Sequence, residues 1–191
     1  MGENGHGGTR YMDASDVKKV LYTAEEIEAI VAGMAERINA DYRGKCLLVI
    51  TVLKGACMFM TDLVRRLPDV DVELDFMVVS SYGSGTTSSG TVKIEHDLSC
   101  DIAGRDVLVV EDILDSGLTL SKLAEELGQR GAASVEIAVL MRKDLGHVPV
   151  VEPRYLGIVC PNEFVVGYGL DYNQKYRQLP YIGILDERVY A

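Results

Sequence analysis

Basic residues, cysteines and long apolar runs are all scarce in this sequence, and each scarcity excludes a class of function. The 191 residues include 19 Lys and Arg against 29 Asp and Glu, which gives a formal net charge of −10. Nucleic acids and membrane surfaces are bound through Lys and Arg, so this balance argues against both as partners. No apolar run approaches the roughly 20 residues of a membrane span, and the N-terminal residues lack the apolar segment of a signal peptide.

The sequence has only 4 cysteines, at positions 46, 57, 100 and 160, and no two have the close spacing of zinc or redox pairs. Cys46, Cys57 and Cys160 lie in or beside apolar runs, where a free cysteine usually behaves as a buried small hydrophobic residue. We therefore expect free structural thiols in a reducing compartment, and a cytoplasmic protein.

Length and composition predict one soluble globular domain. A chain of 191 residues can bury a sizeable core, and 48% hydrophobic with 25% charged residues is ordinary for such a protein. The Gly-rich N-terminus predicts a disordered tail over residues 1–14. No linker divides residues 15–191, which are expected to form a single domain.

Alternating helix and strand patterns predict an α/β fold. Thr23 and Glu26 form a capping box, and apolar residues then recur at helical spacing, which predicts a helix over 24–42. Further helices are expected over 58–67 and from Gly117 to near 131. Apolar runs predict strands at 46–53, 74–80, 106–112, 135–141, 155–160 and 181–185, with a return strand at 91–95. This alternation favours a parallel sheet with helices on both faces.

The most informative stretch covers residues 107–120. A buried apolar strand is followed by Glu111 and Asp112, then by the turn Asp115-Ser116-Gly117-Leu118-Thr119, then by a helical pattern. Open α/β sheets bind ligands at the carboxyl ends of their strands, and this turn offers hydroxyls and backbone N–H groups to a phosphate. The carboxylates suit sugar hydroxyls or a metal ion. The pattern predicts a sugar phosphate site.

Other candidate residues have two interpretations each. Lys54 and Gly55 interrupt a buried strand. Lys54 is either an ordinary solvated charge at the end of the strand, or part of a glycine turn that binds an anion. Residues 81–91 are rich in Gly, Ser and Thr and predict either a hairpin tip or a lid that orders over substrate. Arg142 and Lys143 follow a strand. They form either an exposed basic turn or part of the sheet edge that binds the ligand. An aromatic residue such as Phe164 is more often core, and Asp171 is typical of a turn.

The stretch VEDILDSGLT over residues 110–119 resembles the phosphoribosyl pyrophosphate (PRPP) signature of type I phosphoribosyltransferases. Together with LKGA at 53–56, SSYG at 80–83 and FVVGYGLDY at 164–172, it resembles the branch that acts on 6-oxopurines, over roughly residues 15–190. The resemblance implies the type I phosphoribosyltransferase fold: a mostly parallel twisted sheet flanked by helices, with its core over about 45–160. A small hood of N- and C-terminal segments would cover the sheet edge.

The implied activity is purine salvage. The enzyme would transfer the 5-phosphoribosyl group from PRPP to N9 of hypoxanthine or guanine, with Mg²⁺, to give IMP or GMP and pyrophosphate. A homo-oligomer, dimer or tetramer, is also implied. The rival class is a PRPP-sensing regulator without catalysis. Such proteins use a basic face or an added DNA-binding domain, which the acidic charge disfavours.

The resemblance also implies roles for individual residues. Asp115 would accept the purine proton near N7. The 5′-phosphate would be bound by Asp115, Ser116, Gly117, Leu118 and Thr119, and more through backbone groups because Leu118 stands where some relatives carry Lys. The ribose hydroxyls and Mg²⁺ would be bound by Glu111 and Asp112, with Asp171 as a third metal residue. Pyrophosphate would be bound by Lys54, Gly55, Ser81, Tyr82 and Arg177. The purine would be bound by Lys143, Phe164, Val165 and Asp171.

Two further expectations come from the resemblance. Lys143 is the match for the lysine that donates to the purine 6-oxygen, although the adjacent Arg142 leaves this alignment open by one residue. The Leu53–Lys54 peptide bond is expected to be cis, at least when ligand is bound.

Overall fold

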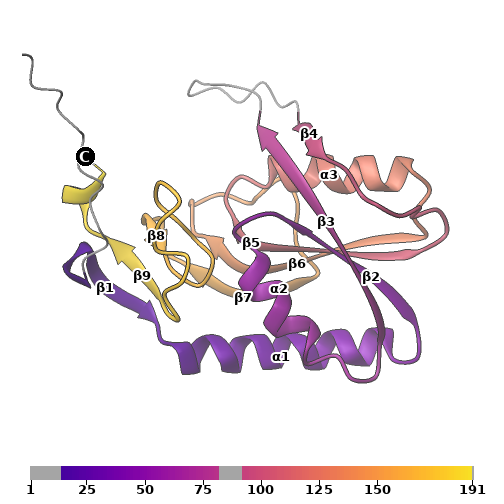
Figure 1. The fold of residues 1–191 in the computed structure, drawn as a ribbon, viewed down its shortest axis with the longest axis horizontal. Coiled ribbons are helices and arrows are strands. Elements are labelled where there is room, and N and C mark those ends of the chain that lie inside the picture. The colour runs from indigo at the N-terminus through magenta and orange to yellow at the C-terminus, as the bar shows by residue number, and fades with distance from the viewer. Residues whose placement is uncertain (1–13, 82–91, 191) are drawn as a thin grey trace, which may run out of the picture.

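A computed structural model describes residues 14–81 and 92–190 of the chain. Its centre is a six-stranded sheet in the order β4-β3-β2-β5-β6-β7 (Figure 1). The strands are β2 (Cys46–Val52), β3 (Asp71–Ser81), β4 (Val92–His96), β5 (Asp106–Leu114), β6 (Ser134–Lys143) and β7 (Tyr155–Cys160). All neighbouring strands pair in parallel except β3 and β4, which are antiparallel. The predicted mostly parallel α/β sheet is confirmed.

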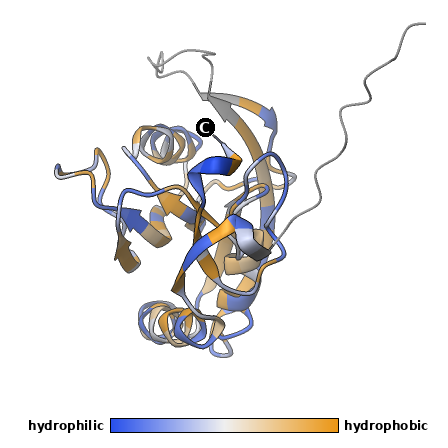
Figure 2. Cartoon of the chain, turned by 90° about the vertical axis from the view of Figure 1, so that its left-hand side faces the viewer, coloured by the Kyte–Doolittle hydropathy of each residue, from blue (hydrophilic) through white to orange (hydrophobic). Residues whose placement is uncertain are grey.

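Helices cover both faces of this sheet (Figure 1). Helices α1 (Ala24–Tyr42) and α2 (Cys57–Val64) pack on one face, and α3 (Leu118–Gln129) packs on the other. Successive strand residues point to opposite faces, so Val49 and Val110 join the cluster with α1 while Ile50 and Val109 join the cluster with α3. Burial on both faces explains why these strands are continuous apolar runs, which Figure 2 shows as orange strands between helices that carry both colours.

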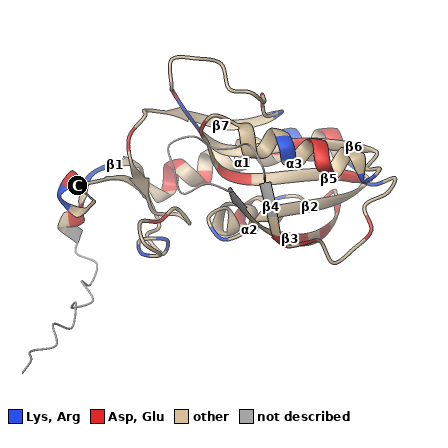
Figure 3. Ribbon diagram, turned by 90° about the horizontal axis from the view of Figure 1, so that it is seen from above, with Lys and Arg blue, Asp and Glu red and all other residues tan. Residues whose placement is uncertain are grey.

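The first helix forms as its sequence predicts. Thr23 Oγ1 accepts a hydrogen bond from Glu26 N at 3.3 Å, and Thr23 N donates to Glu26 Oε2 at 2.8 Å, so the capping box is complete. The buried stripe of the helix consists of Ile27, Val31, Met34, Ala35, Ile38 and Tyr42. In Figure 3 the ribbon of α3 carries both blue and red segments, as expected of a helix that buries only one side.

The N- and C-terminal segments form a second, three-stranded sheet in the order β1-β9-β8. It consists of β1 (Val17–Tyr22), β8 (Val165–Val166) and β9 (Ile182–Leu185), all antiparallel, flanked by the short 3₁₀ helices Ala14–Asp16 and Glu187–Val189. The buried Asp16 ties the two segments together, because Tyr176 Oη donates to its carboxylate at 2.8 Å. This sheet is the hood that the family resemblance implied.

Several predicted boundaries and one burial prediction were wrong. Helix α2 ends at Val64 rather than 67. Strand β5 continues to Leu114, because Ile113 and Leu114 still pair with β6. Strand β6 continues to Lys143, because Lys143 pairs with Cys160 of β7. Of the cysteines, all four free, only Cys160 is buried; Cys46 is exposed at the start of β2, and Cys57 and Cys100 are half-buried.

Other predictions fall largely outside the described residues. These are the disordered tail over residues 1–14, of which only residue 14 is described, and the lid over residues 81–91, of which only the backbone of Ser81 is described. Across residues 14–81 and 92–190, no helix is long and apolar enough to cross a membrane.

Candidate active site

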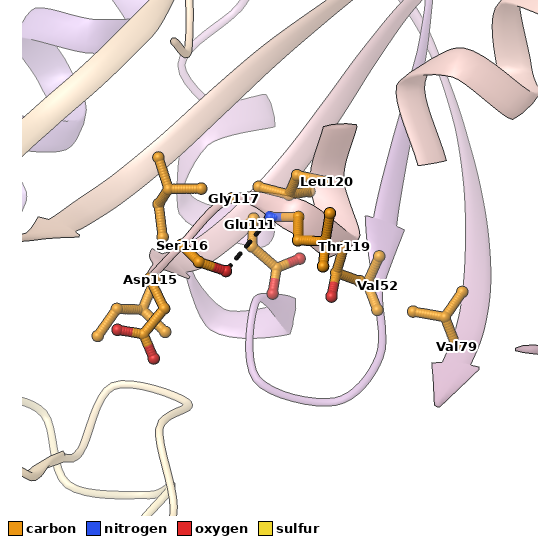
Figure 4. Close-up of a pocket in the computed structure, with 11 residues that line it drawn as sticks. Val52, Val79, Glu111, Asp115, Ser116, Gly117, Thr119 and Leu120 are labelled. Carbon is orange, nitrogen blue, oxygen red and sulfur yellow. Dashed lines mark hydrogen bonds between the residues drawn. The ribbon is translucent and has the colours of Figure 1, made fainter. Parts of the chain in front are cut away.

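A cavity of about 280 Å³ opens at the carboxyl end of β5, the strand in the middle of the parallel sheet. Its polar lining comes from the stretch that the sequence singles out, and includes Glu111, Asp115, Ser116 and Thr119 (Figure 4). Val52 of β2 and Val79 of β3 line the opposite side. The sheet therefore places a polar loop against an apolar wall at the edge where α/β proteins bind ligands.

The loop after β5 leads directly into the N-terminus of α3. Gly117 has φ of 81°, a left-handed conformation, and a Cβ there would lie 3.1 Å from Val151 Cγ1. The N-cap makes no side-chain hydrogen bond, and Ser116 Oγ accepts only weakly from Leu118 N, at 3.4 Å. Backbone N–H groups in the first turn of a helix lack partners within the helix and favour an anion. This turn therefore offers a binding site for a phosphate group.

Glu111 and Asp112 form a pair of adjacent carboxyl groups at the same end of β5. Glu111 Oε2 is shielded from solvent and has no hydrogen-bond donor among the described residues. Burial, together with the neighbouring Asp112 carboxyl, raises the pKa of Glu111 well above its ordinary value. Burial likewise raises the pKa of Asp112 to about 6, although its Oδ1 accepts from Ile113 N at 2.7 Å. Two such groups fit a cation or hydroxyl donors that would supply the missing partners.

Asp115, which lines the cavity, forms an ion pair with Lys143 at the end of β6. Lys143 Nζ lies 3.7 Å from Asp115 Oδ1; the Lys143 side chain is 18% exposed and the Asp115 side chain 63%. The adjacent Arg142 instead pairs with Glu152 at 3.0 Å. Of the two cations whose alignment the sequence leaves open, Lys143 is therefore the one that the structure brings to Asp115.

The loop after β2 lies beside the Glu111–Asp112 pair. The Leu53–Lys54 peptide bond is cis, as expected from the resemblance. A Cβ on Gly55 would overlap Asp112 Oδ2 and lie 3.0 Å from Asp112 Cγ. A Cβ on Gly169 would overlap the Gly55 carbonyl oxygen. Both glycines allow backbone to approach where no side chain fits.

Arg177 and Asp171 form an ion pair in the loop that faces Lys54. Arg177 Nη2 lies 2.7 Å from Asp171 Oδ1, and Nη1 donates to Gly169 O at 2.6 Å. Asp171 Oδ2 accepts from Gln174 N at 2.7 Å. Asp171 is thereby committed to its own loop, and the described residues contain no group of three His, Cys, Asp or Glu side chains placed to hold a metal. The three predicted metal residues do not form one cluster.

Phe164 lies in an aromatic group from the hood. Its ring stacks on Tyr190, with centroids 5.0 Å apart and an angle of 26°, and meets the edge of Tyr172 at 5.7 Å. Phe164 remains 37% exposed, while Val165 is buried in β8. Tyr172 and Tyr190 were not among the predicted site residues, although Tyr172 ends the motif at 164–172.

Two other predicted residues cannot be placed in the site. Ser81 ends β3 and its backbone pairs with Val92, but its side chain is not described. Tyr82 lies outside the described residues. Gln174, conversely, was not predicted and contacts both Lys54 and Arg177. Its position between Asp171 and Arg177 in a polar turn was the only available sequence signal.

Comparisons with known proteins agree on one family. The family described as the phosphoribosyl transferase domain matches residues 18–173. The hypoxanthine-guanine phosphoribosyltransferase of Mycobacterium tuberculosis H37Rv is 53% identical over 190 residues, covering 96% of this chain and 94% of that protein. The Streptococcus thermophilus protein of the same name is 48% identical, covering 92% and 97%.

Solved structures give the same result. A hypoxanthine phosphoribosyltransferase from Staphylococcus aureus superposes with a TM-score of 0.90 at 44% identity, covering 96% of this chain and 100% of that one. A hypoxanthine phosphoribosyltransferase from Trypanosoma cruzi superposes with a TM-score of 0.86 at 42% identity, covering 93% and 100%.

Proposed function

This chain belongs to the phosphoribosyltransferase family, and we propose that its site transfers the 5-phosphoribosyl group from PRPP to N9 of hypoxanthine or guanine with Mg²⁺ bound. The enzyme acts in purine salvage, and its products are IMP or GMP and pyrophosphate. The observation that carries the proposal is the arrangement at the end of β5. The N-terminus of α3, a buried Glu111 oxygen without a hydrogen-bond donor among the described residues and the Asp115–Lys143 pair lie along one edge of the sheet.

The sugar phosphate would lie along the loop after β5. Its 5′-phosphate would accept hydrogen bonds from the first N–H groups of α3 and from the hydroxyls of Ser116 and Thr119, which face the cavity in Figure 4. Its ribose hydroxyls would donate to the Glu111 carboxylate, whose Oε2 lacks a donor in the described protein. These contacts hold C1′ in a fixed position, which lowers the entropic cost of reaction.

Mg²⁺ fits the pair formed by Glu111 and Asp112. Mg²⁺ is often bound by one or two carboxylates together with substrate oxygens and waters, and two adjacent carboxyl groups with raised pKa are present here. When bound, it would neutralise charge on the oxygens of PRPP and the departing pyrophosphate. Asp171 would act on the site through Arg177 rather than as a third ligand.

The leaving pyrophosphate would be received by the loop that contains Lys54 and by Arg177. Cleavage of the bond at C1′ builds positive charge on the ribose and negative charge on the leaving group, so fixed cations stabilise the transition state more than the ground state. Lys54 is exposed, and Arg177 retains a buried Nε without a hydrogen-bond partner among the described residues. The charge of Arg177 lowers the pKa of Asp112 and so opposes part of the effect of burial, which is consistent with a position near the acidic end of β5.

The purine would bind between Phe164 and the Asp115–Lys143 pair. Phe164 offers an exposed ring whose other side is supported by Tyr190. Lys143 would donate a hydrogen bond to the 6-oxygen, and Asp115 would accept the purine proton as the new C1′–N9 bond forms. Adenine carries an amino group at position 6, which would leave the Lys143 donors without an acceptor, so the site favours 6-oxopurines.

A pyrophosphate-release assay with PRPP tests this function. Hypoxanthine and guanine are expected to support turnover, adenine is not, and xanthine in the same series establishes the breadth of the purine site. Absence of turnover with every purine, combined with PRPP binding, would indicate a PRPP-sensing regulator. Full activity in excess chelator would remove the role of Mg²⁺.

We further propose a cytoplasmic homo-oligomer, a dimer or a tetramer. The four free cysteines support a reducing compartment. Large apolar side chains at Val148 and Val150 are 83% and 64% exposed, as expected of residues that meet another subunit. Sedimentation equilibrium of the purified protein distinguishes monomer, dimer and tetramer.

A further inference from the structure

Gln174 places one neutral oxygen between the two cations of the proposed pyrophosphate site. Its Oε1 accepts a hydrogen bond from Lys54 Nζ at 3.2 Å and another from Arg177 Nη2 at 3.4 Å. The two cations lie more than a hundred residues apart in the sequence, and this side chain contacts both. An oxygen that accepts from a lysine and an arginine together is the environment that an oxygen of a phosphate group would occupy.

The backbone holds Gln174 in this position independently of its side chain. Its main-chain N–H donates to Asp171 Oδ2 at 2.7 Å, and Asp171 in turn pairs with Arg177. Its φ is 65°, and Asn173 and Tyr176 beside it also have positive φ. Non-glycine residues rarely adopt this conformation, and here it directs an exposed amide side chain toward Lys54. Replacement of the side chain leaves the hydrogen bond between Gln174 N and Asp171 available.

We propose that Gln174 sets the affinity of the enzyme for pyrophosphate and PRPP by occupying, with its amide oxygen, a position that a pyrophosphate oxygen takes when bound. The inference rests on the proposed assignment of Lys54 and Arg177 to pyrophosphate. In the free enzyme the amide oxygen accepts one hydrogen bond from each cation. The incoming diphosphate must displace it, so part of the binding free energy is lost in breaking two existing hydrogen bonds.

This competition predicts the sign of the effect for two substitutions. In Gln174→Ala Lys54 loses the hydrogen bond to Gln174 and Arg177 loses one of its acceptors, while Arg177 keeps Asp171 and Gly169. Pyrophosphate is therefore expected to bind roughly two- to tenfold more tightly, as removal of ordinary hydrogen bonds implies. In Gln174→Glu a carboxylate takes the same position with charge-assisted bonds and repels the diphosphate, so binding is expected to weaken roughly tenfold or more. If Gln174 merely positioned Lys54, Gln174→Ala would weaken binding instead.

The experiment is calorimetric titration of magnesium pyrophosphate into the purified enzyme, for wild type, Gln174→Ala, Gln174→Glu and Lys54→Ala. Gln129→Glu is the matched control, because Gln129 lies on α3 and its side chain donates to Glu125 on the same helix. The KM values for PRPP and hypoxanthine are measured in parallel. The KM for PRPP should follow the pyrophosphate affinity, and the KM for hypoxanthine should not, because the side chain of Gln174 bonds to Lys54 and Arg177 and not to the proposed purine residues.

The outcomes distinguish the role of Gln174 from the assignment of Lys54 and Arg177 to pyrophosphate. Tighter binding by Gln174→Ala together with weaker binding by Gln174→Glu, with Gln129→Glu equal to wild type, supports the inference. Unchanged or weaker binding by Gln174→Ala, when Lys54→Ala binds weakly, overturns the role of Gln174 and leaves the pyrophosphate site intact. Unchanged binding by Lys54→Ala overturns the assignment of that site and the inference with it. Thermal unfolding of each variant confirms that folded protein is compared.

Discussion

Substitution of Gly55 by alanine is expected to damage both stability and catalysis through a single contact. The added Cβ would overlap Asp112 Oδ2 and lie 3.0 Å from Cγ and 3.4 Å from Oδ1. Asp112 cannot easily move aside, since it is only 5% exposed and its Oδ1 accepts from Ile113 N at 2.7 Å. Either the carboxylate leaves its position beside Glu111, or the loop after β2 shifts away from β5.

The size of the effect follows from the overlap. Inserting a methyl group into a packed site typically costs about 1–3 kcal/mol, which for a chain of this length lowers Tm by about 2–12 °C. Asp112 belongs to the proposed Mg²⁺ and ribose site, and displacement of such a group by about 1 Å costs up to about 10²-fold in rate. We therefore expect kcat/KM for PRPP to fall by about tenfold to a hundredfold.

Thermal unfolding without ligand and steady-state kinetics with PRPP measure the two effects. Gly33→Ala is the matched control, because Gly33 lies in α1 and a Cβ added there would have no neighbouring atom within 4 Å outside its own helix backbone. Helix propensity predicts that this control stabilises the protein by about 0.5–1 kcal/mol and leaves kcat/KM unchanged. A Gly55→Ala enzyme with wild-type Tm and wild-type kcat/KM would refute the argument, since the loop would then accommodate the methyl group without moving Asp112.

Three other predictions follow from the described contacts. Asp115→Asn should lower kcat by about 10²–10⁴-fold with little change in the KM for PRPP, because Asn cannot accept the purine proton; a raised KM with normal kcat would make Asp115 a binding residue. Asp112→Asn should raise the unfolding free energy of the ligand-free enzyme at pH 7 by about 1–3 kcal/mol while lowering activity. The reason is that burial raises the pKa of Asp112 to about 6, so the charged carboxylate is disfavoured in the folded state. Equal Tm values for the variant and the wild type would contradict this. For Asp75, burial raises the carboxyl pKa, but hydrogen bonds from Phe76 N and from the N–H and hydroxyl of Ser99 outweigh it, so the net pKa is lowered. Its stabilisation is present above the ordinary Asp pKa of about 4 and lost as pH falls through the lower folded value, so the Tm deficit of Asp75→Asn should shrink in acid; a deficit independent of pH would contradict the assignment.

Local patterns in the sequence predicted the elements and one part of the site. The capping box at Thr23 and the apolar spacing after it specify α1, because both depend only on residues within a few positions of each other. The run from 107 to 120 likewise contains, in order, the strand, the carboxylates, the glycine turn and the helix N-terminus. A site built from one continuous segment can be predicted from sequence because chain connectivity brings its parts together.

The ends of elements and the exposure of individual residues depended on neighbours. Strand β5 continues through Ile113 and Leu114 because β6 lies beside them. Cys46 resembles a core residue within its apolar run, but it is the first residue of the inner strand β2, at the N-terminal end of that strand, and is exposed. Neither fact has a signal in the adjacent sequence, because both depend on which strand pairs at that position.

The sequence by itself determined the alternation of strands and helices, the glycine turn before α3 and the acidic end of β5. The tertiary structure alone decided which distant side chains meet. Lys143 rather than Arg142 reaches Asp115, Asp171 pairs with Arg177 and does not join Glu111 and Asp112, and Gln174 lies between Lys54 and Arg177. The physical reason is that each of these contacts joins separate strands or loops, so its geometry depends on sheet order and on the dihedral angles of turns.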